Sequence, residues 1–574
     1  MPTPYEAPLA MMRLALDQAR TGDTDGALET DAVLEAAARF ARDVLSPLNS
    51  AGDATSSQLT AARGVVTPEG FGEAYRRFCA DGWTALSVPQ ELGGQGLSVL
   101  LGAAVTEIWG GANLAFAMCP ESAAGAIEAL RLHAPAAIRE RYIPPLVSGR
   151  WAAAMDLTEP QSGSDLSTLR TMARPDGQSW LLTGRKIFIS WGDHDLAENI
   201  VHLVLARTPG APPGLKGISL FVVPKRLPGE RGLAPNDIQA LSLEHKMGIR
   251  ASPTCVMALG EGGGARGWLV GPQHGGMACL FTMMNQMRLG VGLHSTGVAE
   301  RAWQLARAYA QERLQGRDSA GAQRPIVEHA DVRRMLLTMK TLTHAARCLA
   351  YTAAAALDIQ AERRAALLTP LVKAWCSDVA VEVASLGVQV HGGMGYMDDS
   401  EISQVYRDAR IGPIFEGTNF IQAQDLLGRK VIRDDGAALE QLLGEMEHAA
   451  HRLRDHRGSR SAVELATLAA SLLSEVSLLR RAARRLIHSH GAQPDLASAV
   501  AYPFLQWLAV VAGGWQWALT ALQALEHEPA DDSAGALVLG ARFYATHILP
   551  RARAHAAAVE GGADVVASAR PAQL

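Results

Sequence analysis

The sequence predicts a mainly α-helical protein with a central β domain, and three observations carry this prediction. Residues 1–150 contain long segments rich in Ala, Leu and Arg at helical spacing. From about residue 151 the pattern changes to compact apolar runs separated by turns. Helical periodicity returns after Gly276 and continues toward the C-terminus. With 574 residues and 48% hydrophobic content the chain can bury several cores, so about four domains are expected.

In the first 150 residues, we expect helices at 31–48, 68–82, 98–110, 121–132 and 136–147. The polar run AGDATSSQLTAARG at 51–64 is expected to be a loop. In the β region, 171–190 reads as two strands around a Pro-Asp-Gly turn, and further strands are expected at 199–208, 217–225 and 252–260. The domain boundaries predicted from these shifts are 1–150, 151–270, 271–430 and 431–574.

Charge and cysteine content exclude several classes of protein. The formal net charge is −5, which does not attract nucleic acid or an anionic membrane surface. Six scattered cysteines without Cys-x-x-Cys spacing indicate reduced structural thiols, as in a cytoplasmic protein, and no metal site is expected. The N-terminal apolar run is interrupted by charges and differs from a secretory signal, and no membrane span is expected. No glycine cluster opens a βαβ unit, so a Rossmann domain is not expected either.

The segment around Glu416-Gly417-Thr418 places one carboxylate at a joint between a loop and a helix. Such an acid can abstract a proton from a substrate. From these residues alone, a solvated loop acid with Thr418 or Asn419 capping a helix is the commoner interpretation. A second segment, DLTEPQSGSDL at 156–166, changes this balance because it has the form of a strand that ends in Thr-Glu-Pro before a Gly-Ser-Asp turn.

Together these segments resemble the two signatures of the acyl-CoA dehydrogenase family. LSVPQELGGQGL at 86–97, the stretch 283–301 and the stretch 309–317 also fall in the order of that family. The resemblance covers about residues 30–430. Residues 431–574 look like the extra helices of enlarged bacterial members, a group that includes the 3-methylmercaptopropionyl-CoA dehydrogenases.

The resemblance implies an α–β–α architecture with a central β barrel, followed here by a C-terminal helical extension. It implies an FAD-dependent enzyme that converts an acyl-CoA to a trans-2-enoyl-CoA. Glu416 would take the α-proton and the flavin N5 the β-hydride, because no side chain accepts a hydride. Arg288 and Gly417 match substrate-side positions, and Met287 occupies the place where some members carry the base instead.

The resemblance also implies how FAD is held. The residues of the first signature that would meet the flavin are Leu157, Thr158, Gly163 and Ser164, and those that would cover its ring are Phe188 and Ser190. The residues that the partner subunit would contribute are Arg313, Gln389, Gly392 and Gly393, and Thr418 would make a contact beside the base. Met155 stands where the family usually has a ring-facing Tyr. A flavin shared between two chains implies a homo-oligomer, either a dimer or a tetramer, and electron-transfer flavoprotein is the expected acceptor.

Two alternatives remain open at this point. The enzyme could pass its electrons to oxygen, as an acyl-CoA oxidase does. Alternatively, a flavoprotein of this fold could bind DNA through the helix that carries Arg480, Arg481, Arg484 and Arg485. The ordinary interpretation of that basic face is a helix paired with acidic residues.

Overall fold

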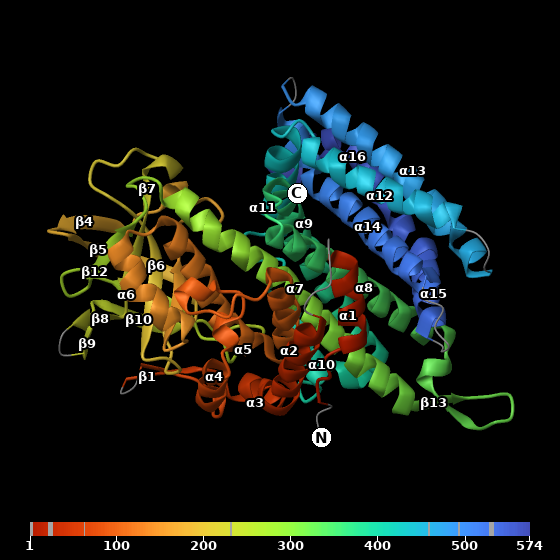
Figure 1. Cartoon of the computed structure of the whole chain (residues 1–574), viewed down its shortest axis with the longest axis horizontal. Helices are drawn as coiled ribbons and strands as arrows, with labels where there is room; N and C mark the ends of the chain where they lie inside the picture. Colours follow the sequence, from red (N-terminus) through yellow and green to blue (C-terminus); the bar gives the residue numbers. More distant parts are fainter. Residues whose placement is uncertain are drawn as a thin grey trace.

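The computed structural model describes residues 4–20, 27–61, 64–229, 232–456, 460–491, 494–526 and 533–573. A β domain occupies one end of the molecule, and helices make up most of the rest (Figure 1). The N-terminal helices lie beside the β domain, and the C-terminal helices form a further layer on the other side of the central bundle. The predicted fold class is confirmed.

In the described residues before the β domain, the α-helices are α1 Leu9–Ala19, α2 Ala27–Phe40, α3 Ser46–Thr55, α4 Phe71–Ala80, α5 Val99–His133 and α6 Ala136–Val147. A π-helical segment at Ala41–Leu45 joins α2 to α3. The expected loop at 51–64 is wrong, because α3 continues to Thr55 and the short strand β1 Gln58–Thr60 pairs with β2 Gly64–Val66. Tertiary packing explains the difference, since Gly52 is buried closely against Phe71 and Ala251.

The two helices expected at 98–110 and 121–132 are parts of α5, which is interrupted at Asn113. Asn113 has a non-helical φ of −162°, and its side chain accepts a hydrogen bond from the Phe116 N–H at 3.0 Å, so the second half of α5 has its own cap. Two described helices, α5 and α14 (Pro494–Glu526), are long and apolar enough to cross a membrane, yet 83% and 67% of their most apolar stretches are buried inside the protein. Core helices have the same composition.

The β domain contains an eight-stranded sheet with the order β10-β11-β5-β12-β7-β6-β3. The remaining strand, β4, pairs with both β5 and β6, so β5, β12, β7, β6 and β4 close into a ring. The strands are β3 Trp151–Asp156, β4 Met172–Asp176, β5 Ser179–Ser190, β6 Asn199–Arg207, β7 Ile218–Pro224, β10 Ile238–Leu243, β11 Thr254–Leu259 and β12 Ala265–Val270. A separate hairpin joins β8 Arg226–Gly229 to β9 Gly232–Pro235.

The central bundle is built around α7 (Gly276–Glu312), which packs against α5 and against α9 (Glu362–His391). The other elements of this region are α8 Ala330–Asp358, α10 Glu401–Ala409 and α11 Asn419–Gln424. The expectation that helical periodicity persists from Gly276 to the C-terminus is wrong at 314–325, where β13 Leu314–Arg317 pairs with β14 Gln323–Pro325 and forms a projecting hairpin (Figure 1).

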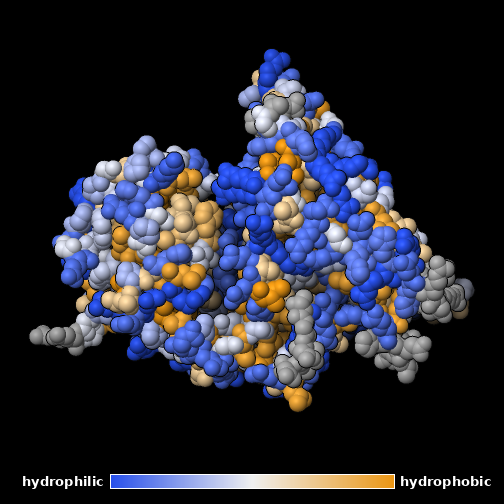
Figure 2. Space-filling view, turned by 45° about the horizontal axis from the view of Figure 1, so that its top comes forward, coloured by the Kyte–Doolittle hydropathy of each residue, from blue (hydrophilic) through white to orange (hydrophobic). Residues whose placement is uncertain are grey.

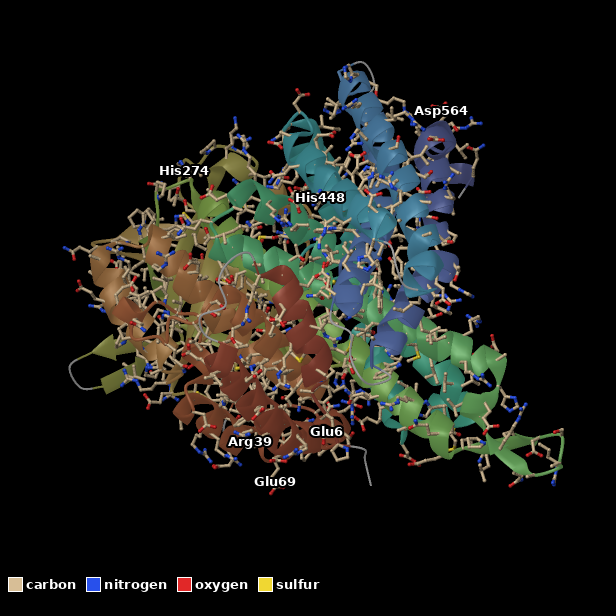
Figure 3. The ribbon with its side chains drawn as sticks, turned by 45° about the vertical axis from the view of Figure 1, so that its right-hand side comes forward. Glu6, Arg39, Glu69, His274, His448 and Asp564 are labelled. Atoms are coloured by element: carbon tan, nitrogen blue, oxygen red, sulfur yellow. The ribbon has the colours of Figure 1, made fainter. Side chains whose placement is uncertain are left out.

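The C-terminal extension consists of α12 Ala437–Asp455, α13 Arg460–Ser489, α14, α15 Ser533–Phe543, α16 Ala552–Gly561 and α17 Ala563–Ser568. In Figure 3, His448 marks α12 and Asp564 marks α17 within this layer, while His274 marks the connection between the β domain and α7. Figure 2 shows that one face of the molecule is mostly hydrophilic, with apolar side chains in small separate groups. All six cysteines are free thiols, and five of them are buried.

A buried charge cluster ties three of the long helices together. Arg347 on α8 donates to Glu107 on α5 and to Glu300 on α7, each at 2.8 Å. The Tyr351 hydroxyl donates to the second oxygen of Glu107 at 2.8 Å. Because these side chains are almost completely buried, each charge depends on the others for stabilisation.

Candidate active site

Glu416 lies in the loop between α10 and α11 in an unusual backbone conformation. Its φ is +56°, a left-handed value that costs a non-glycine residue about 1–2 kcal/mol. Other elements hold this loop through its carbonyl oxygens: Gln422 donates to those of Glu416 and Gly417 at 3.1 Å each, and Lys373 on α9 donates to that of Gly417 at 2.7 Å. Such strain concentrates at functional sites, where the surroundings enforce it.

The pKa of the Glu416 carboxyl group lies near neutral pH. Its Oε2 is buried and has no hydrogen-bond partner among the described residues. Burial raises the pKa of Glu416 to about 7, although the charges of Arg288 and Lys373 oppose this shift. Burial also lowers the pKa of Lys373 to about 7, with Glu416 and Asp378 acting in the opposite direction. A general base works best when its pKa lies near the operating pH.

Arg288 on α7 lies close to this loop. Its side chain is only 4% exposed, its Nε has no partner among the described residues, and its nearest carboxylate is Asp425 at 3.6 Å. A Cβ added to Gly417 would lie 3.7 Å from Arg288 Nη2, which shows how closely the arginine approaches the loop. Burial lowers the pKa of Arg288, while Asp425 and Glu416 raise it.

Sequence reasoning missed a second buried acid, Glu121 on α5. Burial, assisted by the charge of Glu416, raises its pKa well above the usual range. Its Oε2 lies 3.2 Å from His294 Nδ1 on α7, and its Oε1 approaches Gly290 so closely that a Cβ there would lie 1.2 Å away. The sequence signal for Glu121 was a charged residue among apolar residues in the middle of a long helix, and Lys373 on α9 is a second example.

The turn after β3 contains the first group of predicted flavin contacts, and a buried ion pair supports it from beneath. Glu159 accepts hydrogen bonds from the Arg170 and Thr171 backbone N–H groups and from Lys186 Nζ at 2.7–3.0 Å. Burial would raise the pKa of Glu159, but the Lys186 charge and these hydrogen bonds lower it to about 2. Lys186 Nζ also donates to the Leu157 carbonyl at 2.9 Å, so it ties both arms of the turn together.

This turn and the adjacent strand fit a flavin. Gly163 and Ser164 are exposed, their backbone N–H groups donate no hydrogen bond within the described residues, and a Cβ at Gly163 would meet nothing. On β5, a bulge turns Phe188 outward with a φ of +59° and 58% of its surface exposed. Open N–H donors suit a pyrophosphate, and an exposed aromatic side chain suits a flavin ring. The Ile187 N–H donates to the Thr158 carbonyl at 2.9 Å, so the end of β5 that carries Phe188 and Ser190 lies beside the start of the turn.

We expect Lys186→Met to weaken FAD retention roughly 10–100-fold, because Glu159 would remain buried without its cation and the turn would lose a bond to Leu157. Flavin content after gel filtration and fluorescence titration of the apoprotein with FAD measure this effect. Adding Glu159→Gln to Lys186→Met removes the unpaired charge and should restore part of the affinity. Unchanged FAD affinity in the single variant would contradict the proposed support of the turn.

The second group of predicted flavin contacts lies at the opposite end of the molecule. Arg313 caps α7, whose 37 residues span about 55 Å from the β domain to the projecting hairpin (Figure 1). Tyr309 and His391 stack with ring centroids 4.3 Å apart, which places the end of α9, with Gln389, Gly392 and Gly393, beside Arg313. One chain therefore cannot bring both groups to the same flavin.

An apolar cluster lies against the flavin-type turn and includes the residue before Arg288. Met155 and Leu157 pack against the cluster that contains Met287, the residue before Arg288. The Thr418 hydroxyl group caps α11 by accepting a hydrogen bond from the Ile421 N–H at 3.3 Å. An open flavin-type turn, together with a carboxyl group whose pKa lies near 7, is what a flavin-dependent oxidoreductase that removes hydrogen from a carbon acid requires.

Comparisons with known proteins narrow this class. Four family models match in order: "Acyl-CoA dehydrogenase, N-terminal domain" at 28–150, "middle domain" at 154–260, "C-terminal domain" at 274–431, and "Acetyl-CoA dehydrogenase C-terminal like" at 436–570. A 3-methylmercaptopropionyl-CoA dehydrogenase of Ruegeria pomeroyi is 44% identical over 91% of each chain. A butyryl-CoA dehydrogenase of Syntrophomonas wolfei is 35% identical over 74% of this chain and 73% of its own.

Solved structures show the same fold at lower identity. An acyl-CoA dehydrogenase of Bacillus anthracis, solved with FAD, is 22% identical with a TM-score of 0.75 and covers 96% of this chain and 92% of its own. ACDH-11 of Caenorhabditis elegans, solved with C11-CoA, is 20% identical with a TM-score of 0.77 and covers 98% and 96%. The chain belongs to the acyl-CoA dehydrogenase family. The predicted enzyme class and its FAD cofactor are confirmed.

Proposed function

We propose that the protein dehydrogenates an acyl-CoA between its α and β carbons, with Glu416 as the base that takes the α-proton. The observation that carries this proposal is the Glu416 carboxyl group, whose Oε2 is buried without a hydrogen-bond partner among the described residues and whose pKa is raised to about 7. FAD, when bound, supplies the acceptor for the β-hydride. The product is a trans-2-enoyl-CoA.

The neighbouring residues orient the thioester. The Glu416 backbone N–H donates no hydrogen bond within the described residues, so it is available to the thioester carbonyl, where negative charge develops as the α-proton leaves. The left-handed backbone at Glu416 and Gly417 fixes this N–H relative to the carboxyl group. Arg288 adds a buried positive charge on the same side.

FAD would be held by the two groups of residues described above, one from each of two chains. Leu157, Thr158, Gly163, Ser164, Phe188 and Ser190 come from one chain, and Arg313, Gln389, Gly392 and Gly393 come from its partner. Three large apolar side chains next to the second group are exposed, Met394, Tyr396 and Met397. The proposed homo-oligomer covers them. Light scattering during gel filtration should give a dimer or a tetramer, and a monomer that retains FAD would contradict the shared site.

For the substrate, we propose 3-methylmercaptopropionyl-CoA first and fatty acyl-CoA of other lengths second. The support is the relative from Ruegeria pomeroyi, whose similarity extends over 91% of each chain. The test is anaerobic addition of an acyl-CoA panel, from propionyl and methylmercaptopropionyl to palmitoyl, to the yellow protein. Bleaching of the visible flavin band by methylmercaptopropionyl-CoA at the highest kcat/KM supports the first choice. A preference for an acyl chain without sulfur would favour a fatty acyl-CoA, the second choice.

The pH dependence follows from the state of Glu416. A base must be ionised to accept a proton, and burial raises the pKa of Glu416 to about 7. We therefore expect kcat/KM for flavin reduction to rise about tenfold per pH unit below pH ~7 and to level off above it. Stopped-flow reduction from pH 5.5 to 9 checks this. A profile that is flat down to about pH 5 would show that the base has the pKa of an ordinary carboxyl group and would contradict the raised pKa of Glu416.

We propose electron-transfer flavoprotein as the acceptor and the cytoplasm as the location. Stoichiometric hydrogen peroxide formation without an added acceptor would favour the oxidase alternative instead. The DNA-binding alternative gains no support from the basic helix, because Arg480 pairs with Glu440 and Glu447 and Arg485 donates to the Val559 and Glu560 carbonyls. These arginines join α13 to neighbouring helices.

A further inference from the structure

Among the contacts between the C-terminal extension and the scaffold of the Glu416 loop is a set of hydrogen bonds to one carboxylate, Asp378 on α9. Its Oδ2 accepts hydrogen bonds from the Tyr502 hydroxyl at 2.7 Å and from Gln506 Nε2 at 2.6 Å. Both donors lie on α14, one helical turn apart. The other oxygen, Oδ1, accepts a hydrogen bond from Asn419 Nδ2 at 2.8 Å. Asp378 therefore links α14 to the first residue of α11.

The path continues from Asn419 to the loop that carries Glu416. Asn419 Oδ1 accepts a hydrogen bond from Lys373 Nζ at 3.0 Å, and the same ammonium group donates to the Gly417 carbonyl at 2.7 Å. The amide orientation is determined, since an ammonium group only donates and a carboxylate only accepts. A continuous series of hydrogen bonds thus runs from α14 to the residue next to Glu416.

Burial makes this series of contacts sensitive to the loss of any member. Lys373, Asn419 and Gln506 are 0%, 5% and 8% exposed, so an unpaired polar group among them is costly. Burial raises the pKa of Asp378, and hydrogen bonds from Tyr502, Asn419 and Gln506 lower it. Without the two donors on α14, Asp378 would bind a proton more readily and hold Asn419 less firmly.

We propose that the C-terminal extension positions the catalytic loop: Tyr502 and Gln506 fix Asp378, which orients Asn419 and Lys373 and so holds Gly417 and Glu416 in place. This inference rests on the proposed role of Glu416 as the base. It gives two residues of the extension an indirect part in the reaction, although they lie 124 and 128 positions after Asp378 in the sequence. Tyr502 and Gln506 are positioning residues and do not touch substrate.

The test uses the full-length FAD-loaded enzyme with Tyr502→Phe, Gln506→Leu and both together. We expect kcat for flavin reduction to fall roughly 5–50-fold in the double variant with little change in KM, because small displacements of a catalytic group are costly in rate. Hydrogen–deuterium exchange of residues 413–424 should become faster, while FAD content stays at the wild-type level. The acidic limb of the pH profile should also shift, because the limb follows the pKa of Glu416. The charged and titratable groups that face Glu416 are Lys373 from α9, Arg288 from α7 and Glu121 from α5, and the variants disturb the position of Lys373.

Tyr544→Phe is the matched control, because the Tyr544 hydroxyl donates to the Val510 carbonyl at 2.8 Å within the extension and does not lead to Asp378. It should leave kcat and the exchange of residues 413–424 unchanged. Wild-type kcat in the double variant overturns the inference, as does an equal loss in Tyr544→Phe, which would reflect general destabilisation. If Glu416→Gln, measured in parallel, keeps full activity, the proposed function fails, whereas the exchange measurement still reports whether α14 holds the loop.

Discussion

Glu416→Gln should reduce the rate of flavin reduction by an acyl-CoA by about 10²–10⁴-fold, which is the usual effect of removing a positioned base. The amide has nearly the same shape as the carboxyl group but cannot accept the α-proton at neutral pH. Because Glu416 is absent from the predicted FAD contacts, the variant should remain yellow. Single-turnover bleaching under anaerobic conditions measures the step directly, before any acceptor is needed.

Glu440→Gln is a suitable control for this experiment, since Glu440 lies on α12 of the C-terminal extension, where its half-exposed side chain pairs with Arg480. It should retain wild-type bleaching. Substrate binding by Glu416→Gln can be followed separately through the perturbation of the flavin spectrum. A variant that binds FAD and acyl-CoA normally and still bleaches at the wild-type rate would show that another group takes the proton, and the proposed mechanism would be wrong.

Arg347→Met should lower the free energy of unfolding of the helical body by about 3–5 kcal/mol. Arg347 is the cation between Glu107 and Glu300, and Met leaves both carboxylates buried without it. Three long helices, α5, α7 and α8, lose their common polar contact. Thermal and urea unfolding followed by circular dichroism give the magnitude, and FAD release gives an independent midpoint.

Two further variants show whether charge is the cause. Arg76→Met removes an arginine from an exposed pair with Glu73, where both side chains are more than half accessible, and should cost less than about 1 kcal/mol. Adding Glu107→Gln and Glu300→Gln to Arg347→Met removes the unpaired charges and should recover part of the loss. If Arg347→Met were as stable as Arg76→Met, the cluster would contribute little to the fold.

Prediction from sequence succeeded where the information is contiguous. The Pro-Asp-Gly turn gave the β4–β5 hairpin, and the family signatures gave the family, the enzyme class and FAD. Local patterns failed where packing over long distances overrides them. The polar run at 51–64 is partly helical because Gly52 lies against Phe71 and Ala251. The hairpin at 314–325 was missed for the opposite reason, since its exposed residues show no periodic apolar pattern.

The candidate site divides in the same way. Thr158, Gly163 and Ser164 lie within one turn, so their proximity follows from the chain itself. Glu121, Lys373 and Asp378 went unnoticed, because each stands among mostly apolar neighbours on a long helix and only the rotation and packing of that helix decide what it faces. The roles assigned to the site residues stay predictions until the variants are measured.

The sequence by itself determined the order of helical and β regions, the position of one acid before Gly417, and the turn that suits a flavin, because each depends on residues close together in the chain. Only the tertiary structure decided how acidic that carboxyl group is. Its pKa near 7 results from burial, opposed by charges that α7 and α9 bring to Glu416 from Arg288 and Lys373. Burial and charge are properties of the space around a group, and residues distant in sequence create that space.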